Sequence, residues 1–172
     1  ARFSDERESA LRRTGAIGVM RAMTAELQNL RAAIDWAADA GEAALMLRTA
    51  TNLTWYWWLA GLPSEGSERI DAALSAGPTD DVMRARALVD AGLLLAFSSN
   101  TDEAALVLDE AIALARLHGD KEIEATGCVV SSQVSLFRGL IREGADAIDH
   151  AEKLFVELDD DWGAAVAGVV RA

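Results

Sequence analysis

The sequence contains a nine-residue pattern that recurs along the chain. Close copies occupy residues 65–73, 103–111 and 143–151, and a fainter copy at residues 29–37 keeps only the final Ile-Asp-x-Ala. Successive copies begin 36, 38 and 40 residues apart. A repeat of this length is typical of chains that stack one supersecondary unit on the next, as solenoid proteins do. The sequence therefore predicts a repeated architecture, which favours a binding surface over a catalytic site.

Apolar residues spaced three and four apart, with helix-ending residues between them, predict an all-α chain without strands. Thr24 is expected to cap a helix that ends at Gly41. Gly61 is expected to end the next helix, and Pro63 to begin the one after it. The expected helices cover residues 5–22, 24–40, 42–60, 63–76, 80–97, 102–117, 121–138, 141–158 and 161 onward.

Small residues frame each close copy of the pattern at three fixed positions. They are Thr54, Gly66 and Ala73, then Gly92, Ala104 and Ala111, then Ser132, Gly144 and Ala151. Small side chains on paired antiparallel helices let the two backbones approach closely, and the larger Ile70, Leu108 and Ile148 fill the space between pairs. This spacing predicts helical hairpins that stack on their neighbours.

This small, small, large, small spacing resembles the tetratricopeptide repeat over residues 45–158. The resemblance implies a right-handed α-α superhelix of stacked helical hairpins. The tetratricopeptide unit is about 34 residues long, whereas the close copies here begin 38 and 40 residues apart. The extra length lies between the second helix of one hairpin and the first helix of the next, so longer helices are expected at that junction.

We expect one helical-repeat domain over residues 1–172. It comprises N-terminal helices, three repeats and a truncated repeat, at residues 1–41, 42–77, 78–119, 120–159 and 160–172. The chain opens Ala-Arg-Phe-Ser-Asp-Glu without a starting Met, which predicts a fragment of a longer protein.

Residues 26–37, the Trp-rich segment after them and residues 62–66 resemble the start of the helical-repeat region in large bacterial, especially actinobacterial, regulators of the LuxR and AfsR type. Residues 114–120 and 154–163 are similar to helix ends of that family. The resemblance implies a nucleotide-binding ATPase module and a winged helix before the repeats, and a DNA-binding or cyclase domain elsewhere in the chain. None of those parts is encoded in these residues.

The tetratricopeptide resemblance also implies a groove lined by the first helix of each hairpin. The partner-binding positions carried over are Arg48, Thr51, Trp55, Trp58, Arg86, Val89, Leu93 and Gln133, with Ala96, Thr126, Val129 and Leu136 completing the groove. Trp57 is expected in the core. The groove lacks the Lys and Asn residues with which chaperone-binding members hold a terminal carboxylate. In the alternative interpretation, Trp55 and Trp58 pack against the N-terminal helices instead.

Residues with catalytic or metal-binding chemistry are few. His118 and His150 have no second His or Cys at ligand spacing, so no metal site is expected. Cys128 lies four residues before Ser132, which favours a buried structural thiol over a nucleophile. No G-x-x-x-x-G-K-[ST] loop is present to bind phosphates. We therefore expect no catalytic residue, no metal and no cofactor.

The charge of the chain limits its partners. The formal net charge is -12 and the sequence pI is about 4.5, which argues against a nucleic-acid surface because phosphate binding needs clustered Lys and Arg. No run approaches the ~20 apolar residues of a membrane span. The single cysteine cannot form an internal disulfide, which favours a reducing cytoplasm.

Together these patterns predict a non-catalytic protein-interaction or sensor segment of a cytoplasmic transcriptional regulator. Its partner would be a protein or peptide, another domain of the same regulator, or a second copy in a homodimer, without direct contact to nucleic acid or membrane. Two alternatives stay open: a helical accessory domain of an enzyme, and a small-ligand receptor that uses the aromatic groove. The ligand and the flanking domains are not encoded in these residues.

Overall fold

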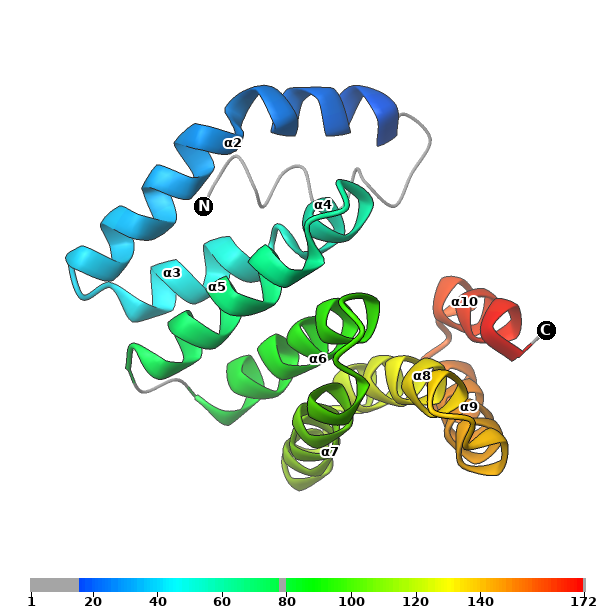
Figure 1. Cartoon of the computed structure of the whole chain (residues 1–172). Coiled ribbons are helices and arrows are strands. Elements are labelled where there is room, and N and C mark those ends of the chain that lie inside the picture. The colour runs from blue at the N-terminus through cyan, green and yellow to red at the C-terminus, as the bar shows by residue number, and fades with distance from the viewer. Residues whose placement is uncertain (1–15, 78–79, 172) are drawn as a thin grey trace. The chain divides into compact units, whose positions relative to one another are not determined.

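The computed structural model describes residues 16–77 and 80–171, and within them all regular secondary structure is helical (Figure 1). This confirms the all-α fold class. The helices are α2 (Ala16–Asp39), α3 (Ala43–Thr51), α4 (Thr54–Leu59), α5 (Pro63–Ser75), α6 (Asp81–Phe97), α7 (Thr101–His118), α8 (Lys121–Phe137), α9 (Ile141–Glu157) and α10 (Asp161–Arg171). In this part of the chain, none of the helices has the length and apolar character needed to cross a membrane.

The chain divides into two compact units, residues 1–79 and residues 80–172, here called unit 1 and unit 2. Unit 1 contains α2 to α5, and unit 2 contains α6 to α10. The division falls at the start of the second predicted repeat.

The turns of unit 2 recur every twenty residues. Ser99, Gly119, Gly139 and Asp159 all have positive φ angles, between 55° and 77°. Glycine adopts this left-handed conformation without steric cost, and it commonly ends a helix. Each long helix therefore ends at the same interval, and a helical hairpin repeats every forty residues.

Aspartate caps mark the first helix of each pair in unit 2. The carboxylates of Asp80, Asp120 and Asp160 accept hydrogen bonds of 2.9 to 3.0 Å from the backbone N–H three residues further on. Such a cap satisfies one of the amides that a helix leaves unpaired at its start, and it adds favourable charge there. The caps lie forty residues apart, like the turns.

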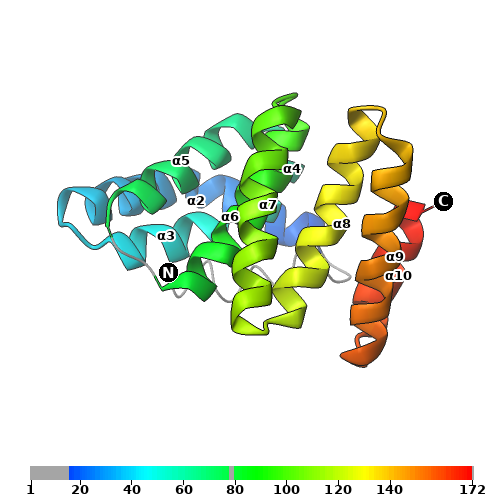
Figure 2. The same cartoon turned by 90° about the horizontal axis from the view of Figure 1, so that it is seen from below.

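Paired helices in unit 2 meet at the small residues that the sequence pattern predicts. The pairs are α6 with α7 and α8 with α9, which lie side by side in Figure 2. The hydroxyl of Ser132 on α8 donates a hydrogen bond of 2.8 Å to the carbonyl oxygen of Gly144 on α9. All nine framing positions are buried: Thr54, Gly66, Ala73, Gly92, Ala104, Ala111, Ser132, Gly144 and Ala151. Close approach of paired helices is confirmed at Gly92 and Gly144 in unit 2, where a Cβ atom would lie 2.6 Å from Leu108 Cγ and 3.2 Å from the Ser132 carbonyl oxygen.

Each first helix of unit 2 also contacts the first helix of the following pair, since α6 contacts α8 and α8 contacts α10. Gly127 on α8 faces both α7 and α6, because a Cβ atom there would lie 3.0 Å from Ile112 Cγ1 of α7 and 3.4 Å from Val89 Cγ2 of α6. On the other side of α8, Val129 packs in an apolar cluster with Phe155 of α9 and Ala167 of α10.

The core of unit 1 is formed by aromatic and aliphatic side chains. Trp57, Tyr56 and Met23 are almost completely buried, which confirms the core position expected for Trp57. The indole N–H of Trp57 has no hydrogen-bond partner among the described residues.

Ion pairs join α2 to α5 in unit 1. Glu65 of α5 accepts hydrogen bonds from Nε and Nη2 of Arg31 and from Nε of Arg69, and Arg69 also pairs with Asp35 at 2.9 Å. Arginine and carboxylate groups paired at two points favour one relative orientation of the helices that carry them.

Two helix predictions in unit 1 were wrong. The single helix expected over residues 42–60 is interrupted at Asn52 and Leu53, between α3 and α4. The hydroxyls of Thr51 and Thr54 bond to nearby backbone carbonyls, and such local bonds compete with a continuous helix. Thr24 lies inside α2 instead of capping a helix, and its hydroxyl bonds to the Met20 carbonyl at 2.8 Å. The helix predicted from residue 5 falls largely outside the described residues.

Candidate functional site

The predicted groove positions of unit 1 include an aromatic pair. Trp55 and Trp58 on α4 are both half-buried and meet edge to face, with ring centroids 5.4 Å apart. Arg48 on α3 is exposed, and Thr51 at the end of α3 is half-buried. Trp55 and Trp58 lie on the same side of α4, because residues three apart are neighbours on the surface of a helix.

The predicted groove positions of unit 2 differ in exposure. Arg86 is exposed and lies 3.5 Å from Glu122, whereas Leu93 and Gln133 are half-buried. Val89 is only 6% exposed because α8 covers it. A partner can reach Val89 only if α8 moves, so its side chain serves the packing of unit 2. Of the positions that complete the groove, Thr126 and Leu136 are exposed, and Ala96 and Val129 are buried.

A further apolar surface was not predicted. Phe97 at the end of α6 and Phe137 at the end of α8 meet edge to face at 6.0 Å, and they are 38% and 56% exposed. Leu136, next to Phe137 in the chain, and Ile141, which begins α9 four residues after Phe137, are exposed as well. These four residues are called the apolar patch. The sequence contained a signal for it, because both phenylalanines stand seven residues before a framing small residue, Ala104 or Gly144.

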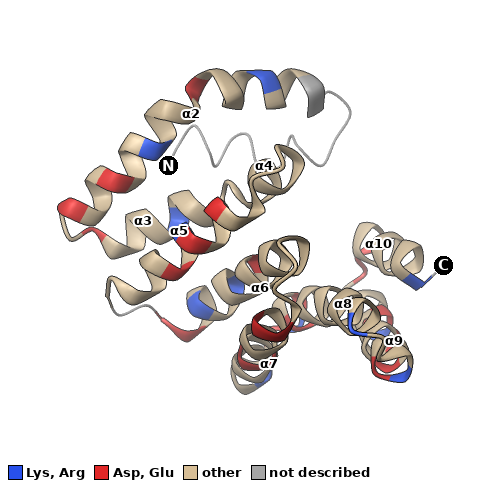
Figure 3. Cartoon of the chain, in the orientation of Figure 1, with Lys and Arg blue, Asp and Glu red and all other residues tan. Residues whose placement is uncertain are grey.

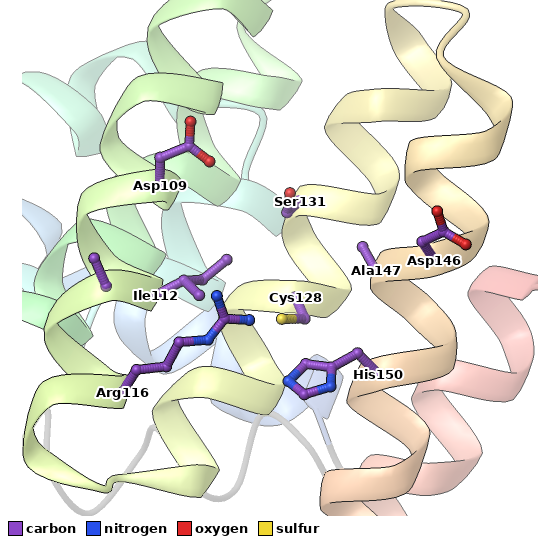
Figure 4. Close-up of a pocket in the computed structure, with 9 residues that line it drawn as sticks. Asp109, Ile112, Arg116, Cys128, Ser131, Asp146, Ala147 and His150 are labelled. Carbon is purple, nitrogen blue, oxygen red and sulfur yellow. The ribbon is translucent and has the colours of Figure 1, made fainter.

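A pocket of about 340 Å³ opens between α7, α8 and α9 of unit 2 (Figure 4). The helices contribute charged and polar groups to its lining: Asp109, Arg116, Cys128, Ser131, Asp146 and His150. In Figure 4, Asp109 of α7 and Asp146 of α9 lie toward one end, and Arg116 and His150 lie toward the other. The two ends of the pocket therefore carry side chains of different charge.

Glu124 on α8 holds the basic end of this pocket in place. Its carboxylate is nearly buried and accepts a hydrogen bond of 2.7 Å from Arg116 Nε. Nε2 of His150 lies 2.7 Å from the same oxygen, and it donates when it carries a proton. Burial raises the pKa of Glu124, but the hydrogen bonds from Arg116 and His150 together outweigh burial, so the pKa lies below its ordinary value.

Cys128 lies at the bottom of the pocket with a side chain that is almost completely buried. Burial raises the pKa of its thiol to about 11. The nucleophile in cysteine chemistry is the thiolate, so the thiol is poorly reactive near neutral pH. This agrees with the structural role that the sequence indicated.

In the described part of the chain, each of the two histidines contacts a single carboxylate. His118 pairs with Asp81 and His150 with Glu124, each in a contact of two residues. Within residues 16–77 and 80–171, no group of three or more His, Cys, Asp or Glu side chains is arranged to hold a metal ion.

The cluster of Arg116, Glu124 and His150 was not predicted from the sequence. Glu124 follows Arg116 by eight residues across a turn and precedes His150 by 26 residues, so no short motif joins them. Only the packing of α7, α8 and α9 brings the three side chains together.

No protein-family model matches this chain, and no curated protein matches it.

Proposed function

We propose that this chain is a non-catalytic protein-interaction or sensor segment of a multidomain bacterial transcriptional regulator. Its partner would be another protein or another domain of the same regulator. The tetratricopeptide-like spacing and the paired helices of unit 2 support a scaffold built from stacked hairpins, and the regulator context rests on the resemblance of residues 26–37 and 62–66 to the LuxR and AfsR type.

The observation that carries the proposal is the apolar patch. Phe137 is 56% exposed and Ile141 is 63% exposed, although unit 2 has an ordered core in which smaller residues are fully buried. Contiguous exposed apolar side chains often mark interaction surfaces, and aromatic residues are enriched at the centres of interfaces. The half-buried pair Trp55 and Trp58 offers unit 1 a comparable aromatic surface.

The chemistry of the pocket supports binding over catalysis. The Cys128 thiol is protonated near neutral pH, and the Glu124 carboxylate already accepts hydrogen bonds from two basic side chains. A general base must be free to take a proton from the substrate, and a nucleophile must be activated. The Glu124 carboxylate is not free to act as a general base, and the Cys128 thiol is not activated as a nucleophile.

Site-specific photocrosslinking in the native cells tests the proposal. A benzoylphenylalanine placed at Phe137 is expected to crosslink to one defined polypeptide, or to another domain of the full-length protein. The matched control carries the same group at Val156 on α9, which is 74% exposed and lies outside the apolar patch. Equal products at both positions, or none at Phe137, would contradict a partner surface at the patch.

The regulator context has its own test in the complete coding sequence. A phosphate-binding G-x-x-x-x-G-K-[ST] loop upstream of these residues is expected if the chain belongs to such a regulator. A complete catalytic domain in its place would support the alternative, a helical accessory domain of an enzyme.

A further inference from the structure

Two contacts join the α6–α7 turn of unit 2 to the α8–α9 turn. The rings of Phe97 and Phe137 meet edge to face with centroids 6.0 Å apart, and Nε of Arg138 lies 3.3 Å from Oδ1 of Asp102. Both turns lie at the upper end of unit 2 in Figure 2. An aromatic contact and an ion pair, made by two residues that are adjacent in the chain, therefore connect one hairpin to the next.

The α8–α9 turn repeats this arrangement forty residues later. Phe137 is the equivalent of Phe97, and Arg142 is the equivalent of Asp102, since the turns recur at that interval. Phe97, which Phe137 covers in part, is 38% exposed, whereas Phe137 is 56% exposed. The second hairpin thus presents an aromatic ring and a charge at the positions through which the first hairpin makes its two contacts.

Arg142 lies beside the apolar patch in a strongly acidic unit. Residues 80–172 contain eighteen Asp and Glu, red in Figure 3, against eight Lys and Arg. Six of these eight cations form ion pairs inside unit 2. Arg142 is exposed, and neither it nor Lys153, eleven residues further along α9, is joined to another described residue by an ion pair or a hydrogen bond. The guanidinium of Arg142 is therefore available to a carboxylate.

We propose that the apolar patch and Arg142 together bind the end of a partner helix that carries an aromatic residue followed directly by a carboxylate. The inference rests on the proposed protein-binding function and names the chemistry that the partner presents to the patch. The partner's ring packs on Phe137 as Phe137 packs on Phe97, and its carboxylate pairs with Arg142 as Asp102 pairs with Arg138. The partner segment thus resembles Phe137 and Arg138 with the charge reversed.

The apolar contact supplies the affinity, and the ion pair selects the partner. Leu136 and Ile141 extend the apolar surface on either side of Phe137 in the chain, and both are exposed. Aromatic side chains that fill the centre of an interface contribute much of its binding energy. An exposed ion pair adds little, but a like charge in the same place disfavours the wrong partner. A carboxylate next to the ring is therefore preferred over a neutral or basic group.

The source of this helix end is a different polypeptide and not a second copy of this chain. The described helices that end in an aromatic residue are α6 and α8, and Ser98 and Arg138 follow their last residues. A second copy that docked through either helix end would place a hydroxyl or a second guanidinium against Arg142. Neither supplies the carboxylate that the position requires.

Titration of the 15N-labelled protein with helical peptides, followed by NMR, tests the proposal. The probe is an amidated, hydrocarbon-stapled helix that ends in Leu-Phe-Glu, and the matched peptides end in Leu-Phe-Gln, Leu-Phe-Lys and Leu-Ala-Glu. The Leu-Phe-Glu peptide is expected to shift the amide resonances of Phe137, Ile141 and Arg142 in a saturable manner. The Leu-Phe-Gln peptide should bind roughly threefold to fivefold more weakly, and the Leu-Ala-Glu peptide about tenfold or more.

Charge reversal at residue 142 separates the ion pair from general attraction. Arg142→Glu is expected to weaken binding of the Leu-Phe-Glu peptide and to strengthen binding of the Leu-Phe-Lys peptide, each by roughly threefold to fivefold relative to the wild type. Lys153→Glu makes the same change of charge on the same helix, outside the patch, and should leave both affinities unchanged. Equal effects of Lys153→Glu would mean that net charge attracts the peptides, which would overturn the contact with Arg142.

The aromatic contact is tested by Phe137→Ala, which is expected to weaken binding of the Leu-Phe-Glu peptide by about tenfold or more. Leu117→Ala is the control, because it shortens an exposed apolar side chain at the far end of α7. Circular dichroism shows whether the helices of each variant are intact. Unchanged binding by a folded Phe137→Ala variant, or no shift with any peptide at several millimolar, would overturn the proposal.

The photocrosslinks at Phe137 separate this inference from the proposed function. The captured partner segment should contain an aromatic residue followed by Asp or Glu, and Arg142→Glu should lower the yield. An undiminished yield in Arg142→Glu overturns the carboxylate contact but still supports a partner surface. Peptide binding without any crosslink in cells supports the chemistry of the patch and contradicts the proposed function. A crosslink within the same polypeptide chain overturns the choice of a different polypeptide.

Discussion

Gly92 on α6 faces Leu108 on α7 so closely that a Cβ atom on residue 92 would lie 2.6 Å from Leu108 Cγ. Leu108 is fully buried, and the contact would fall on its branch point Cγ, not only on the end of the side chain. The absence of a side chain at Gly92 is therefore what lets the two helices approach at this level. A glycine in mid-helix normally costs about 1 kcal/mol relative to alanine, and the close packing offsets that cost here.

Substitution of Gly92 should consequently destabilise unit 2. Gly92→Leu is expected to lower the free energy of unfolding by roughly 1 to 3 kcal/mol or more, because overpacking outweighs a helix-propensity gain of about 1 kcal/mol or less. Urea titration followed by circular dichroism measures the change. Gly168→Ala on α10 is the control, since nothing lies within 4 Å of that position, and it should be neutral or slightly stabilising. If Gly92→Leu raised the free energy of unfolding, the close packing of Gly92 against Leu108 would be contradicted.

Glu65 is expected to give unit 1 an acid-sensitive stability. Hydrogen bonds from Arg31 and Arg69 hold the pKa of its carboxyl below the ordinary value, although burial acts in the opposite direction. A carboxyl with a lowered pKa in the folded state stabilises the fold fully above its unfolded-state pKa of about 4.3. That contribution is lost as the pH falls through the lower folded-state pKa.

Glu65→Gln should therefore reduce stability by about 1 kcal/mol at pH 7 and by much less at pH 3. Tryptophan fluorescence during urea unfolding measures this mainly in unit 1, which holds four of the five tryptophans. Glu68→Gln, an exposed residue of the same helix, serves as the control and should change little at either pH. If Glu65→Gln lost the same amount of stability at pH 7 and pH 3, the packing of the Glu65 side chain and not its charge would account for the loss.

The structure also explains which features the sequence could predict. The spacing of Gly92, Ala104 and Ala111 encodes a hairpin locally, because each small residue recurs at the same place in every copy. The helix ends of unit 2 recur in the same way. In each described turn, a residue with a positive φ angle directly precedes the N-cap residue of the next helix. The Asp80, Asp120 and Asp160 caps follow the same period.

Other features depend on contacts between distant residues. The break between α3 and α4 results from threonine hydroxyls that bond to carbonyls, and Thr24 stays helical because its neighbour Met23 is buried in the core. Helix propensity is a weak guide against such tertiary burial. Glu124 could not be identified as a central residue, because its importance comes from Arg116 and His150 on two other helices.

The exposed face of α10 is expected to promote self-association of the 172-residue chain. Val169 is 78% exposed, whereas Val89 and Val129, at the equivalent positions of α6 and α8, are each 6% exposed. Sedimentation velocity at rising protein concentration should show a growing dimer fraction, and Val169→Lys should reduce it. Leu106→Lys changes an equally exposed side chain on α7 and should have a smaller effect. A strict monomer at high concentration, with solubility unimpaired, would contradict this prediction.

The Trp-rich helix α4 provides the sharpest contrast between a core and a surface residue. Trp57 is fully buried, so Trp57→Ala should cost about 3 to 5 kcal/mol and unfold unit 1 under mild conditions. Trp57→Phe should cost less, because the indole N–H forms no hydrogen bond with the described residues.

Trp58 is half-buried and contacts Trp55 edge to face, an interaction that contributes about 0.5 to 1.5 kcal/mol. Trp58→Ala is therefore expected to lower the melting temperature only slightly and to weaken association with the partner, to which an anchoring aromatic commonly contributes about 2 kcal/mol or more. Iodide should quench part of the tryptophan fluorescence of the wild type and less of it in Trp58→Ala. If Trp57→Ala and Trp58→Ala destabilise the fold alike, and Trp58→Ala leaves the iodide quenching unchanged, then α4 is closed to partners and the interaction must use the apolar patch of unit 2.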